Sequence, residues 1–291
     1  MDILTTTPST FGEHLERTTI RVNPDDLTLS LRVLEETPLP TSRTEAWKYT
    51  RVAKLGKIAF VNRRENVAHF GSYLIDPTAP RVVFVNGHFS SEHSSELEEL
   101  GVTCRILDAA SELAPSTLPL EGEVFNALNT AYLHGGCVIS VAPNSRMEQA
   151  LQIIHIVKGG AVISNFKTLI SVGKNAQASI VQGFFSEGDG ANFCNSSTEV
   201  SLGENAHFTL EKLQYEGGEN FHISTELIEQ ERNSQCTINT VTLNGGLVRN
   251  NIHVYVNGEN CTSNLNGAYL LKERQHVDNH TVIDHRVSHC D

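Results

Sequence analysis

The stretch Asn175-Ala-Gln-Ala-Ser-Ile180 decides the fold, because related stretches return three more times along the chain. They begin at Asn205, Asn233 and Asn260, so the leading asparagines are separated by 30, 28 and 27 residues. In each stretch the second, fourth and sixth residues are small or apolar, and the third and fifth are polar. This alternation is typical of a strand with one buried face and one solvated face.

The interval between the repeats separates the possible architectures. A two-stranded hairpin needs far fewer residues per cycle, and a βαβ unit needs a helical pattern that these intervals lack. Short strands that recur at this spacing without a helix predict a parallel β-helix. Stacked coils would place the four asparagines at one corner, since asparagine tolerates the left-handed backbone conformation and its amide can bond to the next coil. The alternative is four independent sandwich strands with asparagine at the turn entries.

The first third of the chain has a different pattern. Three leucines at positions 27, 31 and 34 predict a short amphipathic helix, which Pro38 and Pro40 would end. A helical turn is expected within residues 41–50, anchored by the sole tryptophan, Trp47. Residues 81–87 predict a strand that ends in a turn, and residues 92–100 predict a short helix.

The domain division follows from these patterns. Proline and glycine within residues 115–122 favour a boundary there. We therefore expect a mainly β protein, with a small helical or α+β N-terminal domain over residues 1–120. A right-handed parallel β-helix is expected over residues 121–291.

Composition excludes several classes of protein. Apolar residues make up 39% of the chain, which is enough to form a core and argues against a fully disordered protein. The formal net charge of −12 argues against nucleic-acid binding and against a polybasic membrane contact. No apolar run is long enough to span a membrane, and the N-terminus lacks the apolar region of a secretory signal. A cytoplasmic protein is expected.

The six cysteines are scattered and form no C-x-x-C pair, so a zinc ribbon or a thioredoxin-like motif is excluded. Such scatter also argues against the disulfide framework of a short secreted chain. Most of these thiols are expected to be small buried side chains.

Four histidines in the last 16 residues raise the possibility of a metal site. The β-branched residues around them favour a strand, on which His285 and His289 would lie about 13 Å apart at roughly 3.3 Å per residue. One ion cannot bridge that distance, so a site built from this segment alone is disfavoured, and His285, His289 and Cys290 are only weak metal candidates. A metal shared with a partner chain stays open.

Signatures of catalysis are missing. The sequence contains no G-x-S-x-G, no P-loop and no H-E-x-x-H. Parallel β-helices are often carbohydrate-active enzymes with clustered acids, and Asp278 and Asp284 are the acids of interest here. No catalytic residue is predicted.

Three stretches together resemble SufD-type members of the SufB/SufD family, whose proteins take part in iron–sulfur cluster assembly. One carries the pattern R-x-E-x-W-K-Y-T, one precedes the predicted β-helix, and one combines D-N-H-T with D-H and H-C. They are residues 40–50, residues 125–136, and residues 246–290. The resemblance covers roughly residues 10 to 291.

The resemblance implies a non-catalytic scaffold in a parallel β-helix fold. Such a subunit pairs with a SufB-like paralogue and a SufC-like ATPase, and a homodimer is also known in the family. No stably bound cofactor is implied, only a transient iron–sulfur cluster in the complex. The alternatives are a β-helix carbohydrate-active enzyme and a metal-binding module that uses the terminal histidines.

The chain departs from the family pattern at its C-terminal end. The family's C-S-H segment near the cluster and its C-terminal helical region have no counterpart here, so the chain is expected to be C-terminally truncated. The cofactor-binding residues therefore remain unknown. An open end of a β-helix exposes unpaired edge groups, so a marginal or self-associating protein is expected unless another chain covers it.

Overall fold

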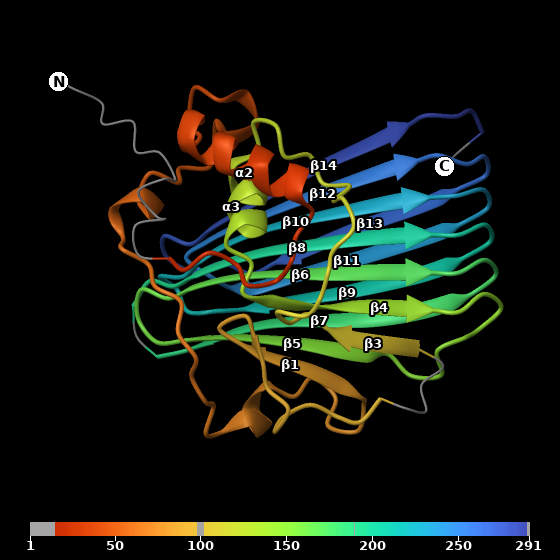
Figure 1. Ribbon diagram of the computed structural model, residues 1–291, viewed down its shortest axis with the longest axis horizontal. Helices are drawn as coiled ribbons and strands as arrows, with labels where there is room; N and C mark the ends of the chain where they lie inside the picture. Colours follow the sequence, from red (N-terminus) through yellow and green to blue (C-terminus); the bar gives the residue numbers. More distant parts are fainter. Residues whose placement is uncertain (1–14, 98–101, 189, 290–291) are drawn as a thin grey trace.

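The computed structural model describes residues 15–97, 102–188 and 190–289, and two sheets dominate it (Figure 1). The first sheet has the strand order β13-β11-β9-β7-β5-β1-β2, and the second has the order β14-β12-β10-β8-β6-β4-β3. The strands of the first sheet are β1 (Arg81–Val85), β2 (His88–Phe89), β5 (Leu151–Lys158), β7 (Gln177–Glu187), β9 (His207–Tyr215), β11 (Gln235–Asn244) and β13 (Thr262–Tyr269). Those of the second are β3 (Val102–Ile106), β4 (Gly135–Val141), β6 (Ile163–Val172), β8 (Phe193–Leu202), β10 (Phe221–Gln230), β12 (Leu247–Val256) and β14 (His276–His285).

From β4 onward the chain alternates between the two sheets, and from β6 onward each strand pairs in parallel with the strand two places before it. Among the described strands, antiparallel pairing is confined to β1 with β2 and β3 with β4. Two facing parallel sheets built by one winding chain form a β-helix. The sequence prediction is confirmed, and a sandwich of independent strands is excluded.

The four repeat asparagines occupy one corner, between the end of a second-sheet strand and the start of a first-sheet strand. Their φ angles are 57°, 58°, 59° and 58°, so all four adopt the left-handed conformation. The amide of Asn205 donates to Asn175 at 2.8 Å, and that of Asn233 donates to Asn205 at 2.9 Å. Asn144 extends this ladder by one rung that the repeat did not predict. The stacked turns lie at the right-hand end of the strands in Figure 1.

The interior between the sheets has two halves. The half beside the asparagine corner is mostly apolar, because the inward positions of the repeats carry aliphatic residues. Its fully buried members include Leu151, Ile180, Leu210, Ile238, Val172, Val200 and Val254. The half beside the opposite corner contains the polar and charged side chains described below.

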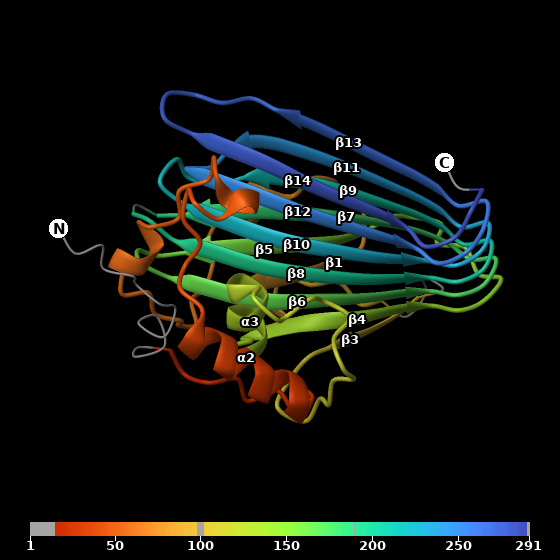
Figure 2. The same cartoon turned by 90° about the horizontal axis from the view of Figure 1, so that it is seen from above.

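Two helices cover the outer face of the second sheet (Figure 2): α2 (Pro24–Glu36) and α3 (Val124–Ala131). Helix α2 begins where Asn23 accepts hydrogen bonds from the backbone of Asp25 and Asp26 at 3.0 and 3.3 Å. Pro24 at the first position and the acidic first turn suit this end of a helix. The predicted helix at residues 27–34 is confirmed.

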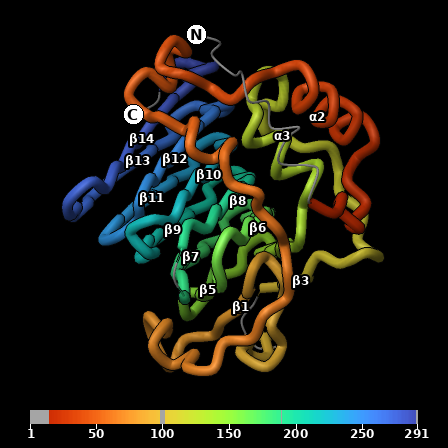
Figure 3. The backbone as a smooth tube through the Cα atoms, turned by 90° about the vertical axis from the view of Figure 1, so that its left-hand side faces the viewer, coloured from red at the N-terminus to blue at the C-terminus, as the bar shows by residue number. Residues whose placement is uncertain are grey.

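Short 3-10 turns follow: η1 (Glu45–Trp47), η2 (Leu55–Lys57) and η3 (Phe70–Tyr73). The turn within residues 41–50 and the burial of Trp47 agree with the sequence prediction. The segment from η1 to η3 runs across the rungs on the side of the solenoid opposite the asparagine corner, where it forms the long orange path in Figure 3.

The strand predicted at residues 81–87 is confirmed, and its turn uses positive φ angles at Asn86 and Gly87. The helix predicted at residues 92–100 is wrong over 92–97, and its remainder lies outside the described residues. Ser94 and Ser95 instead accept hydrogen bonds from the backbone N–H groups of Val83 and Arg81 at 3.0 and 3.2 Å. Serine hydroxyls that bond to backbone compete with helix formation. The domain division at residue 120 remains a prediction.

Candidate functional site

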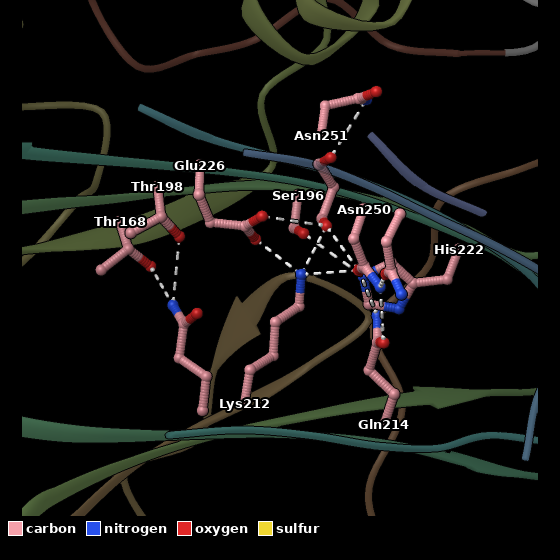
Figure 4. Close-up of polar contacts among 12 residues, drawn as sticks. Thr168, Ser196, Thr198, Lys212, Gln214, His222, Glu226, Asn250 and Asn251 are labelled. Carbon is pink, nitrogen blue, oxygen red and sulfur yellow. Dashed lines mark hydrogen bonds and ion pairs between the residues drawn. The ribbon is translucent and has the colours of Figure 1, made fainter. Parts of the chain in front are cut away.

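The polar half of the interior is centred on Lys212 of β9, whose side chain is 1% exposed. Its ammonium group donates to Glu226 of β10 at 2.6 Å and to Asn250 of β12 at 2.9 Å (Figure 4). It also donates to the hydroxyl of Ser224. Because a buried ammonium ion is unfavourable unless it is paired and hydrogen-bonded, these three partners explain how Lys212 is tolerated inside the protein.

The network extends along the solenoid axis from rung to rung. Gln214 donates to Asn250 at 3.0 Å and accepts from Thr242 at 2.7 Å. Asn250 in turn donates to Asn279 of β14 at 2.8 Å. On the other side of Lys212, Gln182 donates to Thr198 at 3.2 Å. We call the residues Gln182, Lys212, Gln214, Ser224, Glu226 and Asn250 the polar core.

A cluster of three further groups lies at the corner opposite the asparagine ladder. Cys194 of β8 and His222 of β10 are paired directly across adjacent strands, and Glu216 follows the end of β9. One potential ligand atom from each lies within 4.8 Å of the others, and all three residues are buried. Nδ1 of His222 is 2.6 Å from the Glu216 carboxylate. In the described part of the chain this is the one group of three such side chains that is close enough to hold a metal ion.

The thiol of Cys194 is strongly held in its neutral form. Burial raises the pKa of Cys194 well above its ordinary value, the charge of Glu216 raises it further, and Lys212 opposes both. The ring of His222 packs edge-on against Phe184, with a centroid distance of 4.6 Å. The cluster therefore supplies sulfur, nitrogen and oxygen donors in an environment with little water.

The segments at residues 40–50, 125–136 and 246–290 meet at Trp47. Its ring lies 5.1 Å from that of Phe125 and 4.3 Å from the guanidinium carbon of Arg249. Arg249 pairs with Asp278, which also accepts from Thr50. Through Trp47 and Thr50, the segment at residues 40–50 therefore packs against β12 and β14.

Comparison with known proteins identifies the solenoid. Residues 155–291 match the family model described as "SUF system FeS cluster assembly, SufBD core domain". The chain is 24% identical to the iron–sulfur cluster assembly protein SufD of Escherichia coli over 266 residues, which cover 89% of this chain and 62% of the relative. It is 28% identical to the SufBD family protein slr0076 of Synechocystis over 163 residues, or 50% of this chain and 35% of that relative.

The solenoid is thus similar to the SufBD core domain, and the chain as a whole is similar to SufD. The matched region begins within β5 and includes every later rung, so the family domain coincides with the solenoid and with the polar core. The chain spans 62% and 35% of the lengths of these two relatives.

The metal candidates of the sequence analysis lie away from the polar core. His285 ends β14 and is exposed, as is His289, and Cys290 lies outside the described residues. A metal-binding role for them remains a prediction.

Asp278 and Asp284 do not form a pair of acids. Asp278 bonds to Arg249 and Thr50, and Asp284 pairs with Arg286 at 2.9 Å. They lie six residues apart on one strand, or about 20 Å, which is beyond the separation of the two carboxylates in a glycosidase.

No sequence motif singled out the buried residues of this region, which are Lys212, Glu226, Cys194, Glu216 and His222. A signal for Lys212 was present, because alternation that starts at Ala206 places positions 208, 210, 212 and 214 on the inner face. A lysine at an inward position of a predicted strand indicates a buried partner. The other four residues come together only through the register of the paired strands, and the sequence alone does not predict that register.

Proposed function

We propose that this chain is a non-catalytic scaffold subunit in iron–sulfur cluster assembly. It pairs with a SufB-type paralogue and a SufC-type ATPase in the cytoplasm, and the nascent cluster is the transient cargo of that complex. The observation that carries the proposal is the coincidence of the SufBD core match with the solenoid rungs. The names of the two relatives supply the process.

The solenoid suits a scaffold role because side-chain contacts connect its parallel rungs at several places. The asparagine ladder fixes one corner, the polar core links the two sheets, and the contact of Trp47 with Arg249 ties the N-terminal segment to β12. A stack of this kind is a stiff body that can present fixed surfaces to other subunits.

Two other functions have weaker support. The separation of Asp278 and Asp284 disfavours a carbohydrate-active enzyme with paired acids. A metal module of terminal histidines is disfavoured by the strand geometry of His276–His285, because neighbouring histidines on one strand are spread along its length.

Co-expression tests the proposal. The tagged chain is expressed with the SufB-type and SufC-type proteins of the same genome, and the purified material is analysed by size-exclusion chromatography with light scattering. We expect the SufB-type protein to elute with the chain at the mass of a complex. An unrelated parallel β-helix of similar net charge, carrying the same tag, serves as the control.

Elution of the chain without either partner would contradict the proposal. So would depolymerisation of a polysaccharide by the purified chain if Asp278→Ala abolished it.

A further inference from the structure

The buried cluster of Cys194, Glu216 and His222 lies at the corner opposite the asparagine ladder. A scaffold role for the chain does not require these three side chains to be together. A thiol from β8, a carboxylate from the turn after β9 and an imidazole from β10 converge there, and the exposed fractions of the His222 and Glu216 side chains are 1% and 2%. Lys212, the cation whose charge acts on Cys194, is already paired with Glu226 at 2.6 Å. The Glu216 carboxylate is therefore buried with His222 as its side-chain partner.

We propose that Cys194, Glu216 and His222 bind one divalent transition-metal ion of borderline softness, of the class that includes Zn²⁺, Co²⁺ and Fe²⁺. Thiolate, imidazole and carboxylate are the donors that such ions take in proteins. Three protein ligands leave a fourth position open, and the hydroxyl of Ser196, 3.5 Å from Nε2 of His222, lies beside the site.

The spacing of the donors suits this chemistry. Metal–ligand bonds of about 2.0–2.3 Å place tetrahedral donors roughly 3.3–3.8 Å apart. The donors here lie within 4.8 Å of one another, so movements of about 1 Å by side-chain rotation are sufficient. Cys194 and His222 start close together because their strands pair in parallel in this register.

Charge balance also favours a divalent ion. On binding, the Cys194 thiol loses its proton to solvent and the imidazole coordinates in its neutral form. One thiolate, one carboxylate and one dication sum to zero, which is the state that a buried site tolerates best. Lys212 and Glu226 cancel each other nearby, so the interior as a whole stays neutral.

The chain over the cluster at this corner is a short turn. Glu216 is followed by Gly217 and Gly218, and Gly218 and Glu219 are exposed. The turn that carries the carboxylate ligand therefore separates the cluster from solvent. The earlier prediction that no metal binds stably concerned the histidines of the terminal strand. The site proposed here is formed instead by β8, β10 and the turn after β9.

Anaerobic titration of the full chain with Co²⁺ tests the site, with competition by Zn²⁺. We expect one equivalent to bind with thiolate-to-cobalt charge-transfer absorption and release of about one proton per ion. Cys194→Ala is expected to remove the charge-transfer band. Loss of a ligand in Glu216→Gln is expected to weaken binding by roughly tenfold or more, at least the effect of losing an outer-shell partner.

Matched variants control for the other thiols and histidines. Cys236 is a buried thiol in the apolar half, where burial raises its pKa to about 12, and Cys236→Ala is expected to bind Co²⁺ as the unmodified chain does. His289→Ala is expected to have no effect either. Circular dichroism and thermal melting show whether each variant is folded, and Glu216→Gln decides the question if Cys194→Ala does not fold.

Absence of stoichiometric binding by the unmodified chain would overturn the proposal. Binding that survives both Cys194→Ala and Glu216→Gln would also overturn it. Neither result bears on partner capture, so the scaffold proposal is tested separately.

Discussion

The two halves of the solenoid interior follow the same alternation and have opposite chemistry. Beside the asparagine corner, leucine, isoleucine and valine fill the inward positions. Beside the opposite corner, the inward positions of the same strands carry Lys212, Gln214, Glu226 and Asn250. The strand β9 shows both halves, since Leu210 and Lys212 are two residues apart and both are buried.

Both halves meet the same requirement of the fold, which is that inward side chains be buried and that their polar groups have hydrogen-bond partners. The apolar half achieves this by removing hydrocarbon from water, which is non-directional and tolerates exchange between similar side chains. The polar half achieves it through specific partners on both sheets, so each member depends on the others. The two halves should therefore respond differently to substitution.

The largest effect is expected for Lys212→Met, which leaves the Glu226 carboxylate buried without its cation. Breaking a buried pair by removing one partner costs about 3–5 kcal/mol of unfolding free energy. Urea denaturation measures the change. Lys174→Met is the matched control, because Lys174 and its partner Glu204 are 55% and 39% exposed, and it should cost less than about 1 kcal/mol.

The double variant Lys212→Met with Glu226→Leu separates the cost of an unpaired carboxylate from the cost of losing the whole ion pair. Replacement of a whole buried ion pair by apolar groups is often neutral, so most of the lost stability should return. A loss of less than about 1 kcal/mol for Lys212→Met alone would show that the polar core is not a coupled network.

In the apolar half, Leu210→Ala is expected to cost about 3 kcal/mol, through lost transfer energy and the cavity that remains. No charge is left unpaired there, so the cost should be somewhat smaller than that of Lys212→Met. Leu243→Ala on β11 is the control, since Leu243 is 40% exposed. If Leu210→Ala cost clearly more than Lys212→Met in urea denaturation, the proposed difference between the halves would be reversed.

A pH effect is expected from His155, which lies on the inward face of β5 against Phe166, with ring centroids 3.6 Å apart. Burial, and then the charge of His222, lower the pKa of His155 well below 6.5, and neither of its ring nitrogens has a hydrogen-bond partner among the described residues. The folded state thus holds the ring neutral. Stability is retained above the unfolded pKa of about 6.5 and falls as the pH drops below it, by up to about 1.4 kcal/mol per pH unit.

Urea denaturation at pH 7 and pH 5 measures this effect against His155→Phe, which keeps an aromatic ring at the position. We expect the variant to lose less stability than the unmodified chain between the two pH values. Equal losses of unfolding free energy in the two proteins would show that protonation of His155 does not destabilise the folded state.

The sequence predicted the repeating frame well because the frame depends on local rules. Alternation and the asparagine at each turn entry are properties of single rungs, and Asn175, Asn205, Asn233 and Asn260 stack as expected. The candidate site depends on contacts between different strands, with Cys194 and His222 28 positions apart and Lys212 and Glu226 14 positions apart. The closeness of Cys194 to His222 follows from the register of β8 with β10, and Lys212 meets Glu226 across two sheets.

The helix predicted at residues 92–100 failed for a related reason. Its charged and apolar pattern is locally compatible with a helix, but the hydroxyls of Ser94 and Ser95 bond to the backbone of β1. Such a contact depends on where the segment lies in the fold, which propensity does not include.

The smallest of the expected effects is a difference of about 1 kcal/mol between two variants at the asparagine corner, which separates backbone from side-chain causes. Asn205→Ala removes two amide bonds of the ladder and places an alanine at a φ of 58°, so it is expected to cost about 2 kcal/mol. Asn205→Gly removes the same bonds but accepts the left-handed conformation, so about 1 kcal/mol is expected. Urea denaturation of the two variants gives the difference directly. Equal losses would assign the role of asparagine to its amide alone, and the corner would then resemble the polar core in depending on specific partners.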